Sequence, residues 1–332
     1  MEVELRKKYF LQLEKEIQEL VDKKTGLLAD KYSKQICCPL CSASYDLHEM
    51  LFVKNGYTFV RCQECGMIFV NPQVKEEFLN ELYGVSVAND LWVEVQKSDK
   101  EKSWKKDYYI DNICLLGKFL DFRNNINLLD IGCSTGYFLE VLREIRPDWP
   151  AKGLEISEKG FNIALSKGLN VEKKMLHHLG HNEKYNIFTL FGVLEHLSNP
   201  QKILKDIINT AEKRGCYVLV IVPNAYSLYH MFLQSKSVSF DGRNHLLYFS
   251  EVTLKRLFIE QGFKVLHIDT ALTGLSNIMR QIQWFDPYSE VNTEKYVPEK
   301  IKNYFENKET MGKWIQANNL GLRLRILAKY KD

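Results

Sequence analysis

The stretch that decides the fold reads Leu128-Leu129-Asp130-Ile131-Gly132-Cys133-Ser134-Thr135-Gly136-Tyr137-Phe138. It begins as an apolar strand, passes through a turn with two glycines and continues into a helix. Glycines let a backbone approach a ligand closely, and the first turn of a helix offers free N–H groups to an anionic or polar group. We therefore expect a small ligand to bind at this turn.

The spacing within the turn is D-x-G-x-x-x-G, and Ser134 stands where a dinucleotide-binding fingerprint requires its second glycine. This difference weighs against NAD as the ligand. Nineteen residues beyond Gly136, the next strand candidate ends at Glu155, where a carboxylate can accept hydrogen bonds from both hydroxyls of a ribose. The turn and this carboxylate together are much stronger evidence for a binding site than the turn alone.

Around this turn, apolar strand candidates alternate with amphipathic helices. The strand candidates are 126–131, 151–154, 185–191 and 217–222, and the helices between them are 138–145, 158–165 and 200–211. A further helix over 250–261, with Ser250 as its N-cap and Gly262 just past its end, leads into a strand over 263–268. This order indicates an α/β fold with a parallel sheet covered on both faces.

Five of the eight cysteines lie between positions 37 and 65. Two C-x-x-C turns, Cys38/Cys41 and Cys62/Cys65, are separated by 20 residues and predict one tetrahedral Zn²⁺ site. Because four cysteines leave no open position for water, we expect a structural role. The alternative is that these cysteines are reduced and unpaired. Cys37, beside the first turn, is either a spare thiol or a ligand in a shifted register.

Composition and charge exclude several classes of protein. The chain has 332 residues, with 45 Lys and Arg against 42 Asp and Glu, so no strong field attracts nucleic acid or an anionic membrane. The longest apolar stretch, Cys216–Val222, is far too short to span a bilayer, and the polar first residues do not resemble a signal peptide. We expect a cytoplasmic protein.

In the order of these motifs the chain resembles the class I S-adenosylmethionine (SAM)-dependent methyltransferases. The resemblance covers about residues 125–268 and rests on the glycine turn and on segments 190–200, 220–225 and 245–263. It implies a Rossmann-like fold with a seven-stranded sheet. Residues 61–72 also resemble the zinc-ribbon leader of a bacterial subgroup whose members are often linked to sugar, surface-polysaccharide and specialised-metabolite pathways.

The resemblance also implies a SAM site, in which Asp130 and the turn hold the methionine part and Glu155 holds the ribose. The stretch 172–178 departs from the family because no acidic residue is clearly placed there for the adenine amino group, so Met175 and backbone groups are expected to contact the adenine. The full set of expected cofactor residues is Asp130, Gly132, Cys133, Ser134, Gly136, Tyr137, Phe138, Glu155, Ile156, Met175 and Phe191.

Methyl transfer from a sulfonium requires an aligned nucleophile and, where needed, a general base. His196 and His245 follow strand ends at the expected crevice, so they are the candidate bases. For His196 a helix-capping or packing role is the alternative. The insertion between the strand candidate 217–222 and His245 is the candidate acceptor wall, and the alternative is that its aromatic residues pack a lid. Its candidate substrate residues are Tyr226, Tyr229, His230, Arg243 and Asn244, with Arg243 binding a phosphate or carboxylate.

The predicted organisation has five parts: an amphipathic helix over 1–34, a zinc-ribbon module over 35–72, a helical linker or lid over 73–122, the SAM-binding domain over 123–275 and a C-terminal helical tail over 276–332. We expect a methyltransferase of small molecules, such as a sugar, nucleotide-sugar or surface-polysaccharide precursor, acting at O, N or C. Two alternatives are an RNA methyltransferase that grips RNA with the zinc module and a catalytically inactive zinc-containing partner protein. We expect a small-molecule acceptor and no membrane partner. The N-terminal helix and the tail would permit a homodimer.

Overall fold

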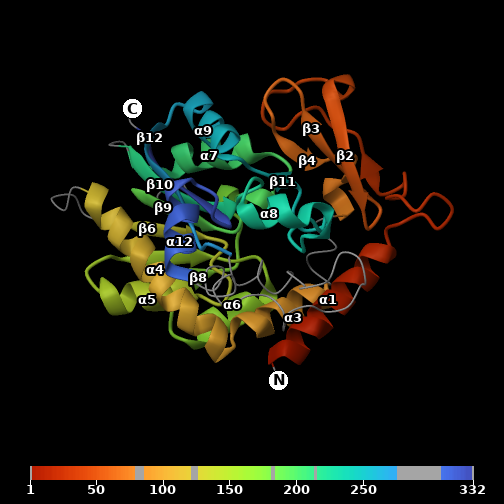
Figure 1. The fold of residues 1–332 in the computed structure, drawn as a ribbon. Helices are drawn as coiled ribbons and strands as arrows, with labels where there is room; N and C mark the ends of the chain where they lie inside the picture. The colour runs from red at the N-terminus through yellow and green to blue at the C-terminus, as the bar shows by residue number, and fades with distance from the viewer. Residues whose placement is uncertain are drawn as a thin grey trace.

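The computed structural model describes residues 2–78, 86–120, 126–180, 184–212, 215–274 and 308–330. Its centre is a seven-stranded sheet in the order β12-β13-β10-β9-β6-β7-β8 (Figure 1). Neighbouring strands pair in parallel except for β13, which runs antiparallel to β10 and β12. The strands are β6 (Leu128–Ile131), β7 (Ala151–Leu154), β8 (Val171–Glu172), β9 (Ile187–Phe191), β10 (Cys216–Pro223), β12 (Lys264–Ala271) and β13 (Arg323–Tyr330). The predicted α/β Rossmann-like fold is confirmed.

Helices cover both faces of this sheet. Figure 1 shows α4 (Asp99–Phe119) and α5 on one side and α7 and α9 on the other. Successive strand residues serve opposite faces: Leu128 belongs to the apolar cluster that includes Phe138, whereas Leu129 belongs to the cluster that includes Leu204. The helices and 3₁₀ turns of this part are α5 (Tyr137–Ile145), α6 (Glu158–Ser166), η2 (Leu176–His178), η3 (Leu194–His196), α7 (Pro200–Thr210), α8 (Leu228–Leu233), η4 (Gln234–Lys236) and α9 (Glu251–Glu260).

The local signals around α9 are those expected from the sequence. The Ser250 side chain accepts a hydrogen bond from the Thr253 N–H, and the Thr253 hydroxyl accepts one from the Ser250 N–H, which forms a capping box. Gly262 follows the helix with a φ of 82°, a left-handed conformation that glycine adopts without steric cost.

The prediction of a helical tail over 276–332 is wrong for its last part. Residues Lys308–Ala317 form a helix, α12, but Arg323–Tyr330 form the strand β13 inside the main sheet. A strand buried on both faces shows no clean alternation of apolar and polar residues, and the charged Arg325 further weakens the apolar pattern of this strand. In the structure, the carboxylates of Asp269 and Asp111 neutralise its guanidinium. Residues 276–307 lie outside the described part of the chain.

The N-terminal region packs against the main domain and shares its core. Strands β2 (His48–Lys54), β3 (Tyr57–Cys62) and β4 (Ile68–Val70) form the predicted β module, and a distant strand, β11 (Leu247–Tyr248), extends its sheet by pairing with β4. One apolar cluster contains both Phe59 of the module and Phe240 of the insertion. This region also contains a separate strand pair, β1 (Ser33–Lys34) with β5 (Gln73–Val74), and the short 3₁₀ turn η1 (Tyr45–Leu47).

Long helices precede the main sheet in the described part of the chain. They are α1 (Glu2–Gln18), α3 (Val87–Gln96) and α4 (Asp99–Phe119). Glu16 of α1 accepts hydrogen bonds from the Ser86 hydroxyl and the Ala88 N–H at the start of α3, so a buried polar contact joins these two helices. Residues 79–85 of the predicted helical linker or lid lie outside the described residues.

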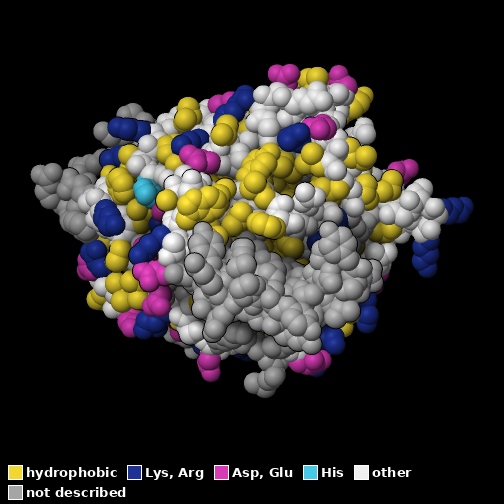
Figure 2. Space-filling view, viewed as in Figure 1, with side chains coloured by type: hydrophobic (Ala, Val, Ile, Leu, Met, Phe, Trp, Pro, Cys, Tyr) yellow, Lys and Arg dark blue, Asp and Glu magenta, His cyan; other side chains and the backbone are white. Residues whose placement is uncertain are grey.

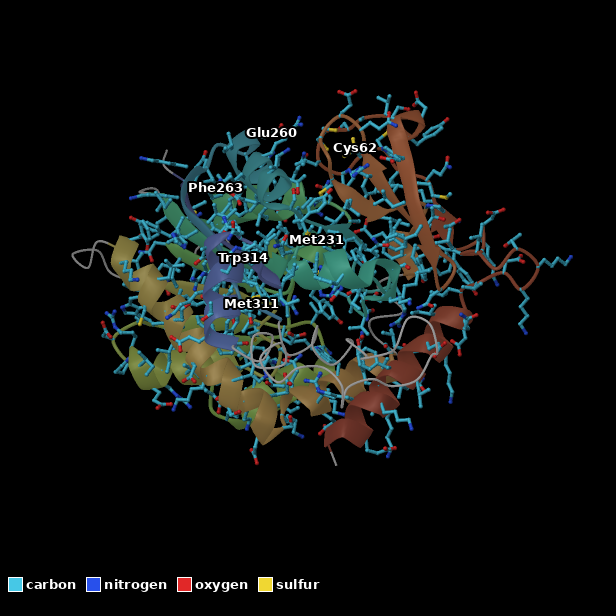
Figure 3. The ribbon with its side chains drawn as sticks, viewed as in Figure 1. Cys62, Met231, Glu260, Phe263, Met311 and Trp314 are labelled. Carbon is cyan, nitrogen blue, oxygen red and sulfur yellow. The ribbon has the colours of Figure 1, made fainter. Side chains whose placement is uncertain are left out.

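Apolar side chains gather on the face of the molecule drawn in Figure 2. On α8 and α12, Met231, Phe232 and Trp314 have exposed fractions of 54%, 65% and 50%; Figure 3 labels the first and last of these. Within the ranges that the structure describes, no helix is both long enough and apolar enough to cross a bilayer.

Candidate active site

A cleft of about 2080 Å³ opens at the carboxyl ends of β6, β7, β9 and β10. This is the edge at which open α/β sheets bind their ligands. Most of the predicted site residues line it: Asp130, Gly132, Cys133, Ser134, Tyr137, Phe138, Glu155, Ile156, Met175, Phe191, His196, Tyr229, His230, Asn244 and His245. The helices α1, α3 and α4 close its other side with residues such as Arg6, Gln96 and Lys105.

The glycine turn is held in a strained, compact shape. Gly132, Ser134 and Gly136 have φ values of 72°, 51° and 73°, in the left-handed region that favours glycine. A Cβ on Gly132 would stand 2.6 Å from Cγ2 of Val193. The Glu155 carboxylate accepts hydrogen bonds from the Ser134 and Ser157 N–H groups, each at 2.7 Å. Glu155 therefore orders the turn and also faces the cleft.

Asp130 is a buried carboxyl group at the floor of the cleft. It is 2% exposed, and its Oδ1 accepts a hydrogen bond of 2.6 Å from the Thr189 hydroxyl. Burial raises the pKa of Asp130 from its ordinary 3.8 to about 7, although the Thr189 hydrogen bond opposes the rise. A carboxylate in this position is poised to accept a cationic N–H donor of a ligand.

The far end of the cleft has an apolar rim. Ile156 and Met175 are 47% and 38% exposed there, which suits the faces of a flat ring. The nearest acid on β8, Glu172, does not line the cleft because it pairs with Lys152 at 2.6 Å and Lys174 at 2.8 Å.

Three histidines of the cleft share one arrangement. The Nδ1 atoms of His196, His230 and His245 lie 2.7, 2.6 and 2.9 Å from the carbonyl oxygens of Asn244, Asn224 and Ser239, respectively. Since a carbonyl only accepts, each Nδ1 carries a hydrogen, and in the neutral form of such a ring the lone pair is on Nε2. Burial lowers the pKa of His196 below its ordinary 6.5 and that of His230 to about 4.

His196 and His245, the candidate general bases, lie side by side in the cleft. Their ring centroids are 4.8 Å apart, and a side-chain oxygen of Glu195 lies within 4.8 Å of both rings' nitrogens. Glu195 is 1% exposed, and its Oε1 is 3.8 Å from Nη1 of Arg323. The nearby guanidinium partly compensates the carboxylate charge beside the two imidazoles, and Oδ2 of Asp241 lies 3.3 Å from Nδ1 of His245.

Three predicted residues lie elsewhere. Arg243 is 3% exposed and pairs with Glu16 of α1 at 2.8 Å, so the prediction that it binds a substrate anion is wrong. Tyr226 is 41% exposed and does not line the cleft. Gly136 does not line it either: it caps α5, and a Cβ there would stand 2.3 Å from Leu169.

Sequence reasoning missed Glu195, Arg323, Gln96 and Lys105, all of which line the cleft. Glu195 precedes His196 within a segment already singled out, so its position was a usable signal. Gln96 and Lys105 lie on α3 and α4, whose sequence periodicity indicates packing only, and Arg323 lies on the unrecognised strand β13.

The four predicted zinc ligands come together in the N-terminal module. The Sγ atoms of Cys38 and Cys65 are 3.5 Å apart, those of Cys41 and Cys62 are 3.6 Å apart, and all four lie within 4.8 Å of one another. A tetrahedron with Zn–S bonds of about 2.3 Å has edges of about 3.8 Å, so the four thiols fit Zn²⁺. The structure records them as free cysteines, and it also leaves Cys37 exposed and apart from the cluster.

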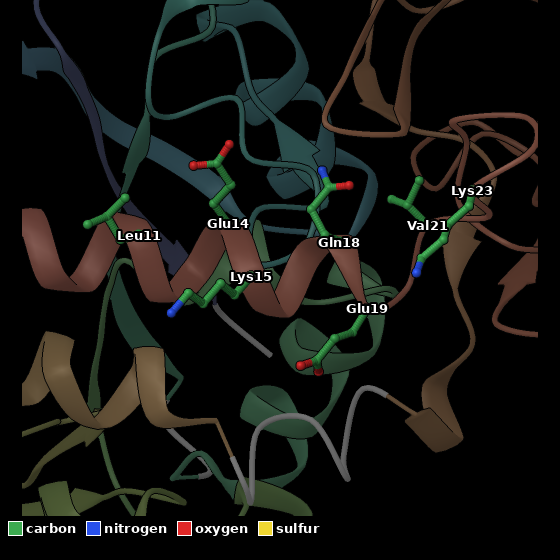
Figure 4. A pocket seen from close by; sticks show the side chains of 7 residues that line it. All are labelled: Leu11, Glu14, Lys15, Gln18, Glu19, Val21 and Lys23. Atoms are coloured by element: carbon green, nitrogen blue, oxygen red, sulfur yellow. The ribbon is translucent and has the colours of Figure 1, made fainter.

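A second, smaller hollow of about 670 Å³ lies along α1 and the loop that follows it (Figure 4). Its lining includes Leu11, Lys15 and Glu19, and it shares no described residue with the large cleft. It brings together no cysteine or histidine, so the chemistry concentrates in the large cleft.

Comparisons with known proteins agree with this architecture. A family model described as a methyltransferase domain matches residues 103–268, which are 166 of the 332 residues and thus half of the chain. The ubiquinone biosynthesis O-methyltransferase of Hydrogenovibrio crunogenus is 26% identical over 113 residues, which cover 32% of this chain and 46% of that protein. The chain thus spans about half the length of the curated relative it matches.

Two solved structures illustrate the similarity in fold. The plantazolicin methyltransferase BpumL in complex with SAH has a TM-score of 0.50 and 13% identity, covering 76% of this chain and 94% of that chain. The magnesium protoporphyrin IX methyltransferase of Synechocystis PCC 6803 with bound SAH has a TM-score of 0.49 and 13% identity, covering 77% and 100%. At 13% identity the similarity to the first of these structures concerns the fold alone.

Proposed function

Because this chain belongs to the family of methyltransferase domains, we propose that it transfers the methyl group of SAM to a small-molecule acceptor bound in the large cleft. The observation that carries the proposal is the turn from Gly132 to Gly136, with the Asp130 carboxyl at one end and the Glu155 carboxylate at the other. The Asp130 carboxyl matches the α-ammonium of SAM, the turn matches the chain that carries the sulfonium, and the Glu155 carboxylate matches the ribose hydroxyls.

In this proposal the residues of the chain mainly bind and orient SAM and the methyl acceptor. SAM supplies an electrophilic methyl group when it is bound. Asp130 accepts the α-ammonium, the turn around Ser134 approaches the methionine chain, and Glu155 accepts the ribose hydroxyls with lone pairs that its backbone contacts leave free. Ile156 and Met175 pack against the adenine, and Phe191 with Phe138 forms the apolar floor, where their rings lie 4.7 Å apart. Cys133 contributes to the same wall of the cleft.

The acceptor is proposed to lie beside His196 and His245. In the neutral form with a hydrogen on Nδ1, either ring can accept a proton on Nε2, and we propose that one of them takes the proton of the nucleophile as the methyl group is transferred. Tyr229, His230 and Asn244 line the same end and offer further hydrogen-bonding groups. These hydrogen-bonding side chains favour a substrate that bears hydroxyl groups. The relative named as an O-methyltransferase supports transfer of the methyl group to oxygen. A sugar or nucleotide-linked sugar is the acceptor class we propose.

We also propose that the Cys38–Cys65 cluster binds one structural Zn²⁺. The module it would stabilise is joined to the acceptor end of the cleft, because β4 pairs with β11, which begins two residues after His245. The Gln201 side chain also donates to the Leu40 carbonyl within the first cysteine turn.

A homodimer that uses the exposed Trp314 region of α12 is a further proposal, and light scattering of the purified chain tests it.

Calorimetry with SAM tests the cofactor proposal. The wild type should bind with measurable heat, whereas Gly132→Arg should not, since no side chain fits between this turn and Val193. Gly180→Arg is the matched control, because a Cβ at Gly180 meets nothing within 4 Å. Circular dichroism confirms that both variants fold. Absence of binding by the wild type contradicts the proposal.

A further inference from the structure

One cation that lines the cleft is held only by long contacts. Lys105 of α4 lines the cleft with a side chain that is only 13% exposed. Its Nζ donates a hydrogen bond of 3.3 Å to the side-chain oxygen of Gln96 and lies 3.8 Å from Oε2 of Glu101. Glu101 is itself engaged by Arg6 of α1. The Trp104 ring centroid is 5.7 Å from the same Nζ. An ammonium has three hydrogens to donate, and because the contacts with Gln96 and Glu101 are long, this one can still donate to a further acceptor in the cleft.

Lys105 is linked to the glycine turn through Gln96. The side-chain oxygen of Gln96 accepts the hydrogen bond from Lys105 at 3.3 Å and also one from the Ser134 hydroxyl at 3.5 Å. Ser134 is the central residue of the turn that the proposed function assigns to the methionine part of SAM. The ammonium of Lys105 therefore lies one side chain away from the amino-acid end of the proposed cofactor site.

The other cations that line the cleft nearby are already committed. Arg6 donates to Glu101, and Arg323 faces Glu195 on the side of the cleft that carries His196. Asp130 provides a partner for the α-ammonium of SAM. Lys167 contacts the turn itself, where its Nζ donates to the Thr135 carbonyl at 2.7 Å, but it pairs with Glu140 and does not line the cleft. A buried carboxylate requires a charged or hydrogen-bonding partner.

We propose that Lys105 binds the α-carboxylate of SAM and that Gln96 positions its ammonium against the glycine turn. This inference rests on the proposed function and names a cofactor-binding residue that lies ahead of the main sheet. In this role, α3 and α4 form a wall of the cleft that favours nucleosides carrying an amino-acid group over nucleosides without one. It also places the charge of Lys105 between Glu101, Arg6 and Arg323, the charged groups that face it from α4, α1 and β13.

These surroundings make the interaction sensitive to pH. Together, burial and the nearby Arg323 and Arg6 lower the pKa of Lys105 to about 8, although Glu101 acts in the opposite direction. A lysine is charged below its pKa, so the carboxylate contact is complete below pH 8 and weakens as the pH rises through and beyond 8. Bound carboxylate raises that pKa, which moves the loss in the complex toward higher pH.

Two ligands separate this contact from the rest of the site. S-adenosylhomocysteine carries the amino-acid end, whereas 5′-methylthioadenosine has the same nucleoside and sulfur without it. Calorimetry on the full chain measures both ligands against the wild type, Lys105→Met, Lys105→Arg and Lys106→Met. Lys106 is the matched control because it follows Lys105 on α4 but pairs with Glu144 on the exposed surface.

We expect Lys105→Met to weaken S-adenosylhomocysteine by about 10- to 100-fold and to change 5′-methylthioadenosine by less than about twofold. Lys105→Arg should retain most of the affinity and keep it above pH 8, where that of the wild type falls. Lys106→Met should match the wild type. Equal weakening of both ligands by Lys105→Met, or weakening of neither, overturns the inference while leaving the proposed function intact. Failure of the wild type to bind either ligand overturns both.

Discussion

Replacing Asp130 by asparagine should stabilise the cofactor-free protein and weaken its affinity for the cofactor. The carboxyl group is 2% exposed, and burial raises its pKa from 3.8 to about 7. The folded state therefore binds this proton more tightly than the unfolded state does. A rise of this size corresponds to about 4 kcal/mol of unfolding free energy. Asparagine removes the charge and keeps an oxygen that can accept the Thr189 hydrogen bond.

The direction with pH follows from the raised pKa. The stability associated with the neutral carboxyl is fully present below the unfolded pKa near 3.8 and is lost as the pH rises toward 7. About 2 kcal/mol is lost by pH 5 and about 4 kcal/mol by pH 8. The stability gain of Asp130→Asn over the wild type should therefore be about 2 kcal/mol larger at pH 8 than at pH 5. Urea unfolding followed by tryptophan fluorescence measures this difference.

The same substitution should weaken S-adenosylhomocysteine by about 10- to 100-fold at pH 8, because the α-ammonium loses its anionic partner. Asp148→Asn is the control, since Asp148 is an exposed carboxylate paired with Arg146 outside the cleft. A variant that is no more stable than the wild type at pH 8, or one that keeps full affinity, would refute the argument that a buried carboxylate is retained here for the cofactor.

Three other predictions follow from the contacts described above. Cys38→Ser should reduce the zinc content below one ion per chain by elemental analysis and lower the unfolding midpoint; an unchanged metal content contradicts the tetrahedral site. Arg243→Met should cost about 3 to 5 kcal/mol of unfolding free energy because it leaves Glu16 buried without its cation, yet the cofactor affinity should not change. In an NMR titration, His196 should change protonation below pH 6.5 and His230 near pH 4; midpoints at or above 6.5 argue against burial of these rings.

Much of the main domain could be predicted because its local signals are strong. The strand, glycine turn and helix from Leu128 onward, and the capping box at Ser250, each have a sequence pattern with one physical interpretation. The cysteine turns are equally specific because tetrahedral metal binding requires four ligands at short spacing. These elements depend mainly on neighbours in the chain.

The remaining features depend on contacts between distant segments. Arg325 is tolerated inside β13 only because Asp269 and Asp111 surround it, so the strand cannot be recognised without its partners. Arg243 has the chemistry of an anion-binding residue, and only the position of α1 shows that Glu16 is its partner. Lys105 resembles any helix-surface lysine until α3 and the glycine turn are placed beside it.

The most direct test is a crystal structure of the full chain grown with S-adenosylhomocysteine. The account predicts the ligand in the large cleft, with its ribose hydroxyls on Glu155 and its amino group on Asp130. An empty cleft, or a different nucleotide bound at the turn after β6, would contradict it.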